Sequence, residues 1–124
     1  MKYLLLVYAE EGLLSPEEMQ HCYEESTGLT RELDKKGQFY SASPLQSVAL
    51  ATSVRVREGR RLVTDGPFAE TREQLGGYFL IEAADLDEAI EIAGKIPGAR
   101  WGTVEIRPVV ELSGRTDRKG DFLR

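Results

Sequence analysis

The sequence contains a single cysteine, no excess of basic residues and no long apolar run. The one cysteine, Cys22, excludes a disulfide framework and a thiolate metal cage within one chain. The formal net charge of -5 argues against a nucleic-acid-binding surface, because such a surface needs clustered lysine and arginine. No apolar segment approaches the length that crosses a bilayer. We therefore expect neither nucleic acid nor a membrane among the partners.

Signatures of common cofactors are missing as well. The only histidine, His21, stands between Glu18 and Glu25 and lacks the spacing of a metal site. The pair Gly76-Gly77 is too short to cradle a phosphate, and no glycine-rich fingerprint opens a helix. We expect no cofactor and no metal. A solvated helix face is a better interpretation of His21 than a catalytic role.

The composition is typical of one soluble globular domain, with 41% hydrophobic and 30% charged residues among 124. The N-terminal run MKYLLLVYAEEG is too short for a secretory signal and continues into acidic residues, so we expect a cytoplasmic protein. We assign residues 1–111 to the domain. Residues 112–124 form a polar tail without periodicity, which we expect to be mobile.

Hydrophobic patterning predicts a central strand at 2–9, followed by a long helix. Ser15 and Glu18 form the signature of a capping box, Pro16 suits the first helical position, and Gly37 supplies a stop. One side of this helix carries residues at helical spacing that we expect to face the core. They are Met19, Cys22, Ser26, Leu29 and Leu33, among which we interpret Cys22 as a small buried hydrophobe.

The remaining elements alternate strands with a second helix. A short strand is expected at 38–43, a hairpin at 52–64 around Glu58-Gly59, a strand at 77–83 and an edge strand with Pro108 at 103–111. In the hairpin, Val54 and Val56 are expected to face inward, with Arg55 and Arg57 on the opposite face. The helix at 85–98 begins at Asp85 and ends at Pro97-Gly98. Its expected apolar stripe is Leu86, Ala89, Ile90 and Ala93.

This order predicts an α+β protein with a ferredoxin-like β-α-β-β-α-β arrangement and an antiparallel sheet. Two helices cover only one face of such a sheet, whereas the strands at 2–9 and 77–83 are apolar on both faces. An apolar face left in water would be too large for a soluble monomer. We therefore expect a homodimer in which two copies pack sheet against sheet.

The string LVTDGPFAETREQLGGYFLI (62–81), with DLDEAIEIAGKIPGARWGTVEIRPV (85–109) after it, resembles the DGPF branch of the YCII-related family. The likeness covers residues 1 to about 111 and implies a dimeric α+β barrel. A few YCII-like proteins are associated with breakdown of chlorinated aromatic compounds, and DGPF proteins are often encoded beside sigma factors of the extracytoplasmic-function type. The resemblance makes Asp65 the counterpart of a proposed catalytic aspartate. It places the matching histidine near Ser26, more than a turn from His21.

Two interpretations of Asp65 stay open. In the first, Asp65-Gly66-Pro67 is a turn: the carboxylate bonds a nearby backbone N–H, Gly66 adopts an unusual φ, and Pro67 fixes the next residue. In the second, Asp65 is a general base at the end of a strand, beside a cavity walled by Phe68 and Tyr78. Because a rigid turn can hold a general base in a fixed position, the two interpretations are compatible.

Further candidate ligand-binding residues each have a structural alternative. Tyr8 and Arg55 line a polar pocket or pair with carboxylates across the sheet. Arg72 anchors a ligand carboxylate or faces solvent. Trp101 walls a pocket or fills the core. Two functional hypotheses follow: a cofactor-independent acid/base enzyme acting on a small aromatic or lactone-like molecule, and a non-catalytic dimeric module that binds a ligand or a sigma factor.

Overall fold

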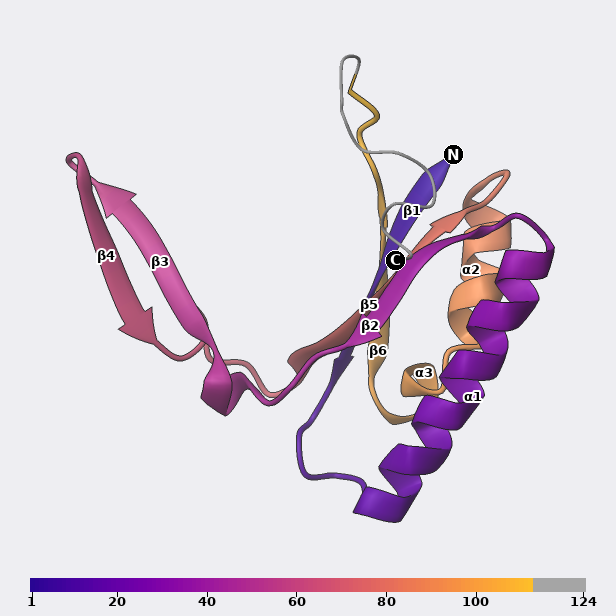
Figure 1. The fold of residues 1–124 in the computed structure, drawn as a ribbon, viewed down its shortest axis with the longest axis horizontal. Coiled ribbons are helices and arrows are strands. Elements are labelled where there is room, and N and C mark those ends of the chain that lie inside the picture. The colour runs from indigo at the N-terminus through magenta and orange to yellow at the C-terminus, as the bar shows by residue number, and fades with distance from the viewer. Residues whose placement is uncertain (113–124) are drawn as a thin grey trace.

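Four strands and two main helices form the body of the molecule (Figure 1). The computed structural model describes residues 1–112, so the predicted tail lies outside the described residues except for Leu112. The described elements are β1 (Lys2–Ala9), α1 (Pro16–Lys35), β2 (Phe39–Pro44), the 3-10 turn η1 (Val48–Leu50), β3 (Thr52–Arg57), β4 (Arg60–Asp65), β5 (Gln74–Glu82), α2 (Leu86–Gly94), the single helical turn α3 (Gly98–Trp101) and β6 (Thr103–Pro108).

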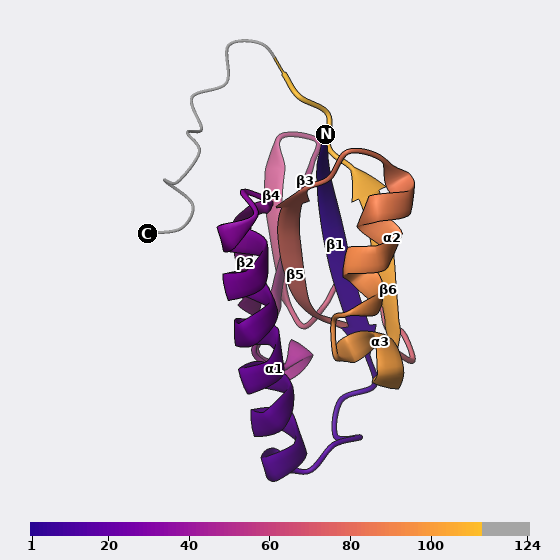
Figure 2. The ribbon, with the colours of Figure 1, turned by 90° about the vertical axis from the view of Figure 1, so that its right-hand side faces the viewer.

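The main sheet is antiparallel, with the strand order β2-β5-β1-β6. This order is consistent with a ferredoxin-like arrangement, and the predicted α+β class with an antiparallel sheet is confirmed. Pro108 lies on the edge strand β6, where its missing N–H leaves no gap in the ladder. The helices cover one face of the sheet, as Figure 2 shows. No helix in the described part of the chain is long and apolar enough to cross a membrane.

Local chemistry sets the ends of α1 as predicted. The Ser15 N–H donates to Glu18 Oε1 at 2.9 Å, and the Glu18 N–H donates to Ser15 Oγ at 3.1 Å. These two bonds complete the capping box and satisfy backbone donors that the helix itself leaves free. At the other end, Gly37 has φ +70°, a left-handed conformation that glycine adopts without strain.

The core lies between the helices and the covered face of the sheet. In α2, the predicted stripe is partly wrong: Leu86 and Ile90 are each 51% exposed, whereas Ile92 is buried together with Ala89 and Ala93. Both sets have helical spacing and share Ala89 and Ala93, and the buried one includes Ile92 and continues to Ile96. The buried cluster comprises Tyr3, Leu5, Leu29, Leu33, Phe79, Ile81, Ala83, Ala89, Ile92, Ala93 and Ile96.

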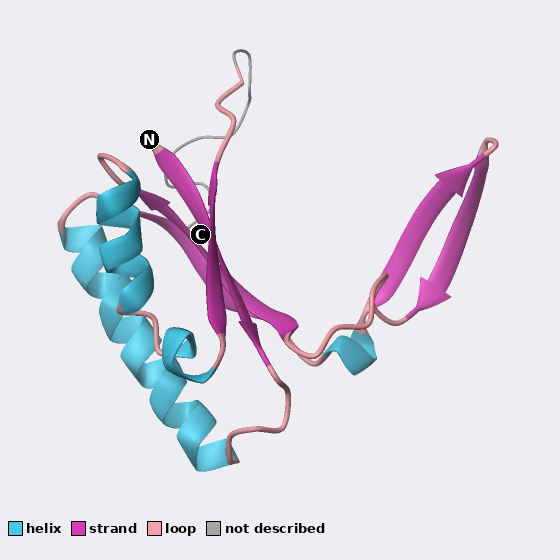
Figure 3. Cartoon of the chain, turned by 180° about the vertical axis from the view of Figure 1, so that it is seen from behind, coloured by secondary structure: helices cyan, strands magenta, loops and turns pink. Residues whose placement is uncertain are grey.

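The β3–β4 hairpin stands apart from the main sheet, on the side opposite the helices (Figures 1 and 3). Its turn is confirmed, with positive φ at both Glu58 and Gly59. The expectation that Val54 and Val56 face inward is wrong for a single chain, because they are 59% and 63% exposed. The two strands pair only with one another, so neither hairpin face meets the core.

Candidate functional site

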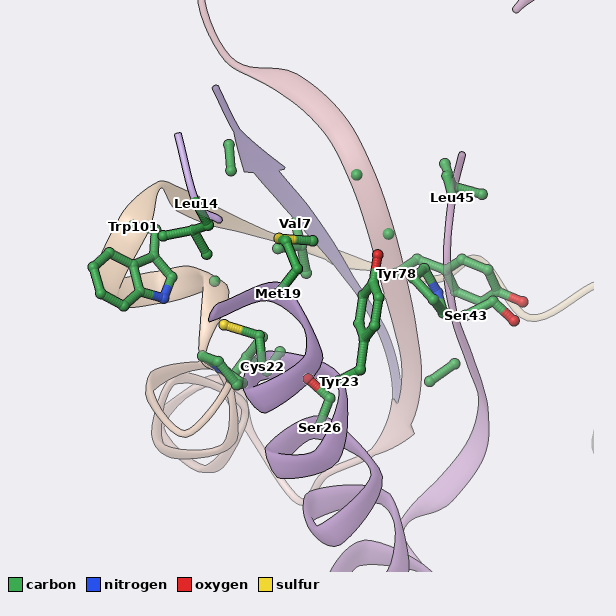
Figure 4. A pocket seen from close by; sticks show the side chains of 18 of the residues that line it. Val7, Leu14, Met19, Cys22, Tyr23, Ser26, Ser43, Leu45, Tyr78 and Trp101 are labelled. Carbon is green, nitrogen blue, oxygen red and sulfur yellow. The ribbon is translucent and has the colours of Figure 1, made fainter. Parts of the chain in front are cut away.

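A cavity of about 740 Å³ lies between the N-terminal half of α1 and the covered face of the sheet (Figure 4). The end of β1, the loop to α1, the segment from β2 to η1, the start of β5 and the turn α3 complete its wall. Its volume falls within the roughly 300–1,000 Å³ typical of small-molecule pockets. The cavity is therefore large enough for a small ligand.

The side chains along α1 explain why the core opens here. Leu29 and Leu33 are buried and close the C-terminal half of the helix against the sheet. One and two turns earlier, the same stripe carries Ser26 and Cys22, whose side chains are short and only half-buried. Figure 4 shows both, together with Met19, at the cavity. Cys22 is thus a wall residue, not the buried core residue that we expected.

The cavity wall is mainly apolar and carries no positive charge. No lysine, arginine or histidine lines it among residues 1–112, and its two carboxylates, Glu10 and Glu11, lie at the loop that follows β1. Hydroxyl groups of Tyr23 and Ser26 on α1 supply hydrogen-bonding capacity. A carboxylate or phosphate ligand would find no cation there, so the electrostatics favour a neutral molecule.

Glu11 fastens the loops around the cavity. Its Oε1 accepts a hydrogen bond from Ser47 Oγ at 2.7 Å, and its Oε2 accepts one from the Val48 N–H at 2.9 Å. The Glu11 N–H donates to Gln74 Oε1 at 3.0 Å. The loop after β1 is therefore joined to η1 and to the first residue of β5, all of which contribute to the wall.

Removing the Glu11 carboxylate should loosen this wall. In Glu11→Ala we expect the Val48 amide to exchange with deuterium about tenfold faster, because it loses a hydrogen bond to a charged group, which is stronger than a neutral one. The increase is limited to this size because the atoms of this hydrogen bond are exposed to solvent. Glu10→Ala is the matched control, because Glu10 is exposed and makes no hydrogen bond within residues 1–112. Equal exchange rates in the two variants, measured by NMR, would show that Glu11 does not hold the loop.

Two of the predicted site residues, Trp101 and Tyr78, are at the edge of the cavity, but the Tyr78 ring lies on the sheet face away from the helices, because Tyr78 pairs with Leu6 and precedes the buried Phe79. Tyr78 Oη lies 3.0 Å from Ser41 Oγ. Tyr8 lies on the uncovered face of the sheet, where partial burial and the nearby Glu105 carboxylate raise the pKa of its phenol. The other predicted site residues, Arg55, Asp65, Phe68 and Arg72, are exposed and do not line the cavity.

Asp65 ends β4, opposite Thr52 in the hairpin ladder. Its carboxylate makes no hydrogen bond or ion pair within residues 1–112, so the expected side-chain bond to a backbone N–H is not part of the turn. Backbone contacts hold the turn: Gly66 has φ +98°, and its N–H donates to the Ala51 carbonyl at 2.7 Å. Ser53 Oγ donates to the Gly66 carbonyl at 2.7 Å. The glycine conformation agrees with the turn interpretation.

His21 is exposed on α1 and is not among the residues that line the cavity, whereas Ser26 is. Sequence reasoning did not identify Glu11, Cys22 or Ser26 as site residues. The signal for the last two was present, because short side chains interrupt a stripe that elsewhere carries leucine and methionine. Glu11 had no local signal, since its partners Ser47 and Val48 are 36 and 37 residues away.

Sheet order and helix placement define an α+β domain that is consistent with a ferredoxin-like arrangement. The model of the YCII-related domain matches residues 1–113, and the chain belongs to that family. It is also similar to an uncharacterised protein of Rhizobium meliloti (strain 1021), with 34% identity over 114 residues that cover 88% of this chain and 92% of the relative. The predicted family is confirmed at this level.

Proposed function

We propose that the protein binds a small, neutral, largely apolar molecule, such as a substituted aromatic compound, in the cavity between α1 and the sheet. The observation that carries this proposal is a cavity of about 740 Å³ whose described wall is mostly apolar and contains no cationic side chain. Pockets of this kind obtain affinity from apolar burial and orientation from a few polar groups.

The polar groups of the wall suit a ligand with one hydroxyl or carbonyl group. Tyr23 and Ser26 present hydroxyl groups to this space from α1. Each hydroxyl can donate or accept, which allows several ligand orientations to be satisfied. A permanently charged anion would lose its hydration without gaining a counter-charge.

Binding is favoured over acid/base catalysis because neither carboxylate of the wall is positioned as a base, and Glu10 is exposed in the loop that follows β1. Glu11 already accepts two hydrogen bonds in the loop contacts, and both Asp65 and His21 lie elsewhere. A catalytic role for Asp65 therefore stays a prediction. Membership of the DGPF branch, which is inferred from the string between Val63 and Tyr78, stays a prediction, as does the association with a sigma factor that the branch implies.

Paired probes of similar shape and different charge test the proposal. We expect 2-naphthol, which is neutral at pH 7, to bind at least about tenfold more tightly than 2-naphthoate by isothermal titration calorimetry. Equal or tighter binding of the anion would contradict the proposed ligand class. Conversion of the naphthol during the titration would instead favour the enzyme hypothesis.

A matched pair of variants assigns the binding to this cavity. Cys22→Phe with Ser26→Phe adds two rings to the wall, and we expect it to lower the affinity for 2-naphthol at least about tenfold. His21→Phe with Glu24→Phe adds the same rings to exposed positions of α1 and should leave the affinity unchanged. If both pairs bind 2-naphthol as the unaltered protein does, the ligand lies outside the cavity.

A further inference from the structure

The first strand of the hairpin has different chemistry on its two faces. Successive side chains of a strand point to opposite sides, and β3 reads Val54, Arg55, Val56 and Arg57 in order. All four side chains are exposed, with Val54 at 59% and Val56 at 63%. The strand therefore presents two valines on one face and two arginines on the other.

The outer edge of β3 is an open strand edge. The small sheet consists of β3 and β4, so β3 pairs with one strand and with no second strand within residues 1–112. Its sequence, TSVRVR, contains no proline, and its register with β4 runs without a bulge. Proline and bulges commonly block such an edge against further pairing. The N–H and C=O groups along this edge can thus receive another strand.

The arginines determine which kind of strand suits this edge. Arg57 and Arg60 lie opposite one another in the ladder, and neither has an ion-pair partner within residues 1–112. Like charges in directly opposite positions are destabilising. Antiparallel pairing of β3 with the same strand of a second copy would add arginines to this face. A strand that carries carboxylates there would instead form charge-assisted hydrogen bonds.

A peptide segment fits this edge better than a nucleic acid does. The whole chain has a net charge of -5 although the hairpin carries four arginines, so the remainder of the protein repels a long polyanion. A phosphate backbone also lacks the alternating N–H and C=O groups that a strand edge pairs with. Figures 1 and 3 show the hairpin away from the main sheet, where a short segment can contact it alone.

We propose that β3 is a docking edge for an extended segment of another protein in which acidic and apolar residues alternate. In the added strand, carboxylates lie beside Arg55 and Arg57, and apolar side chains lie beside Val54 and Val56. Backbone hydrogen bonds along the edge supply affinity, and the alternating side chains supply specificity. This docking is separate from ligand binding in the cavity and does not rest on it.

Two fluorescein-labelled peptides of equal composition and charge test the alternating pattern. One alternates valine and glutamate over about eight residues, and the other places all its valines before all its glutamates. By fluorescence anisotropy, we expect the full chain to bind the alternating peptide at least about tenfold more tightly. Equal affinities would overturn the proposal, because charge attraction alone does not distinguish the two orders. An oligothymidylate of equal length that binds as tightly as the alternating peptide would also overturn it.

Charge reversal in β3 tests whether the peptide binds at this edge. Arg55→Glu with Arg57→Glu should lower the affinity for the alternating peptide at least about tenfold. Arg31→Glu with Lys35→Glu makes the same change of net charge at exposed positions of α1, on the other side of the main sheet (Figure 3). We expect this control to change the affinity less than about threefold. Equal losses in the two pairs would exclude β3 as the docking edge.

Milder substitutions keep the test decisive if charge reversal disturbs the fold, which far-UV circular dichroism checks. Arg55→Gln with Arg57→Gln removes both charges and should still lower the affinity at least about threefold. Val54→Thr with Val56→Thr keeps the β-branched shape and removes apolar surface from the other face. It should weaken the alternating peptide and leave the block peptide unchanged. Unaltered binding of the alternating peptide in either pair would contradict the docking edge.

Discussion

Replacing Gly102 by alanine is expected to destabilise the protein by about 3 kcal/mol or more. An ideal Cβ at this position would lie 2.0 Å from the Tyr8 carbonyl oxygen and 2.9 Å from the Ala9 Cα. Both atoms belong to the backbone and cannot turn aside as the end of a flexible side chain does. Gly102 directly precedes β6, so relief would require the end of β1 or the start of β6 to move.

Gly94→Ala is the matched control for this prediction. Gly94 is the last residue of α2, and an added Cβ would meet no atom within 4 Å. Alanine also restricts the unfolded chain, so we expect a change between zero and about 1 kcal/mol of added stability. Urea unfolding followed by circular dichroism measures both variants. Similar midpoints in the two would show that β1 and β6 separate easily at this contact.

Leu5→Ala is expected to lower the free energy of unfolding by about 2–5 kcal/mol. Leu5 is fully buried on β1, with Phe79 and Ile106 as its neighbours in the two adjoining ladders. The truncation removes apolar contacts and leaves a void that a four-stranded sheet cannot close by a small shift. A loss of this size is a large part of the 5–15 kcal/mol typical of a domain.

Leu86→Ala makes the same chemical change at an exposed position. Leu86 opens α2 and is half exposed, and alanine is a good helix former, so the stability should stay within about 0.5 kcal/mol. Comparison of the urea midpoints at equal slope separates the two variants. Similar losses of stability in the two variants would mean that burial within a single chain does not determine how much each leucine stabilises the fold.

Local signals in the sequence were the most informative for the fold. Ser15 with Glu18 and the pair Glu58-Gly59 specify structure through hydrogen bonds and backbone angles within a few residues, and both were confirmed. Leu86 and Ile90 of α2 were assigned to the core wrongly because two stripes have the same spacing. Which stripe is buried depends on the residues that meet the helix, which no local pattern specifies.

The site was harder to predict than the fold. The cavity depends on how far the short side chains of Cys22 and Ser26 stand from the sheet, a distance that only tertiary packing determines. Of the ligand-binding candidates, Trp101 lies at the cavity, and strand alternation turns the Tyr78 ring to the other face of the sheet. The emphasis on Asp65 followed from family resemblance and turn chemistry, and neither says which surface the hairpin meets. Val54 and Val56 were expected to face inward and are exposed for the same reason, because strand alternation does not say which surface the hairpin meets.

The chain's single cysteine and single tryptophan both lie on the wall of one cavity. This placement gives the protein two natural reporters of what the cavity contains. A thiol reagent that modifies Cys22 occupies part of that space, and the indole fluorescence of Trp101 responds to the polarity of its surroundings. Occupancy can thus be followed without adding a label or changing a residue, and the two signals check one another.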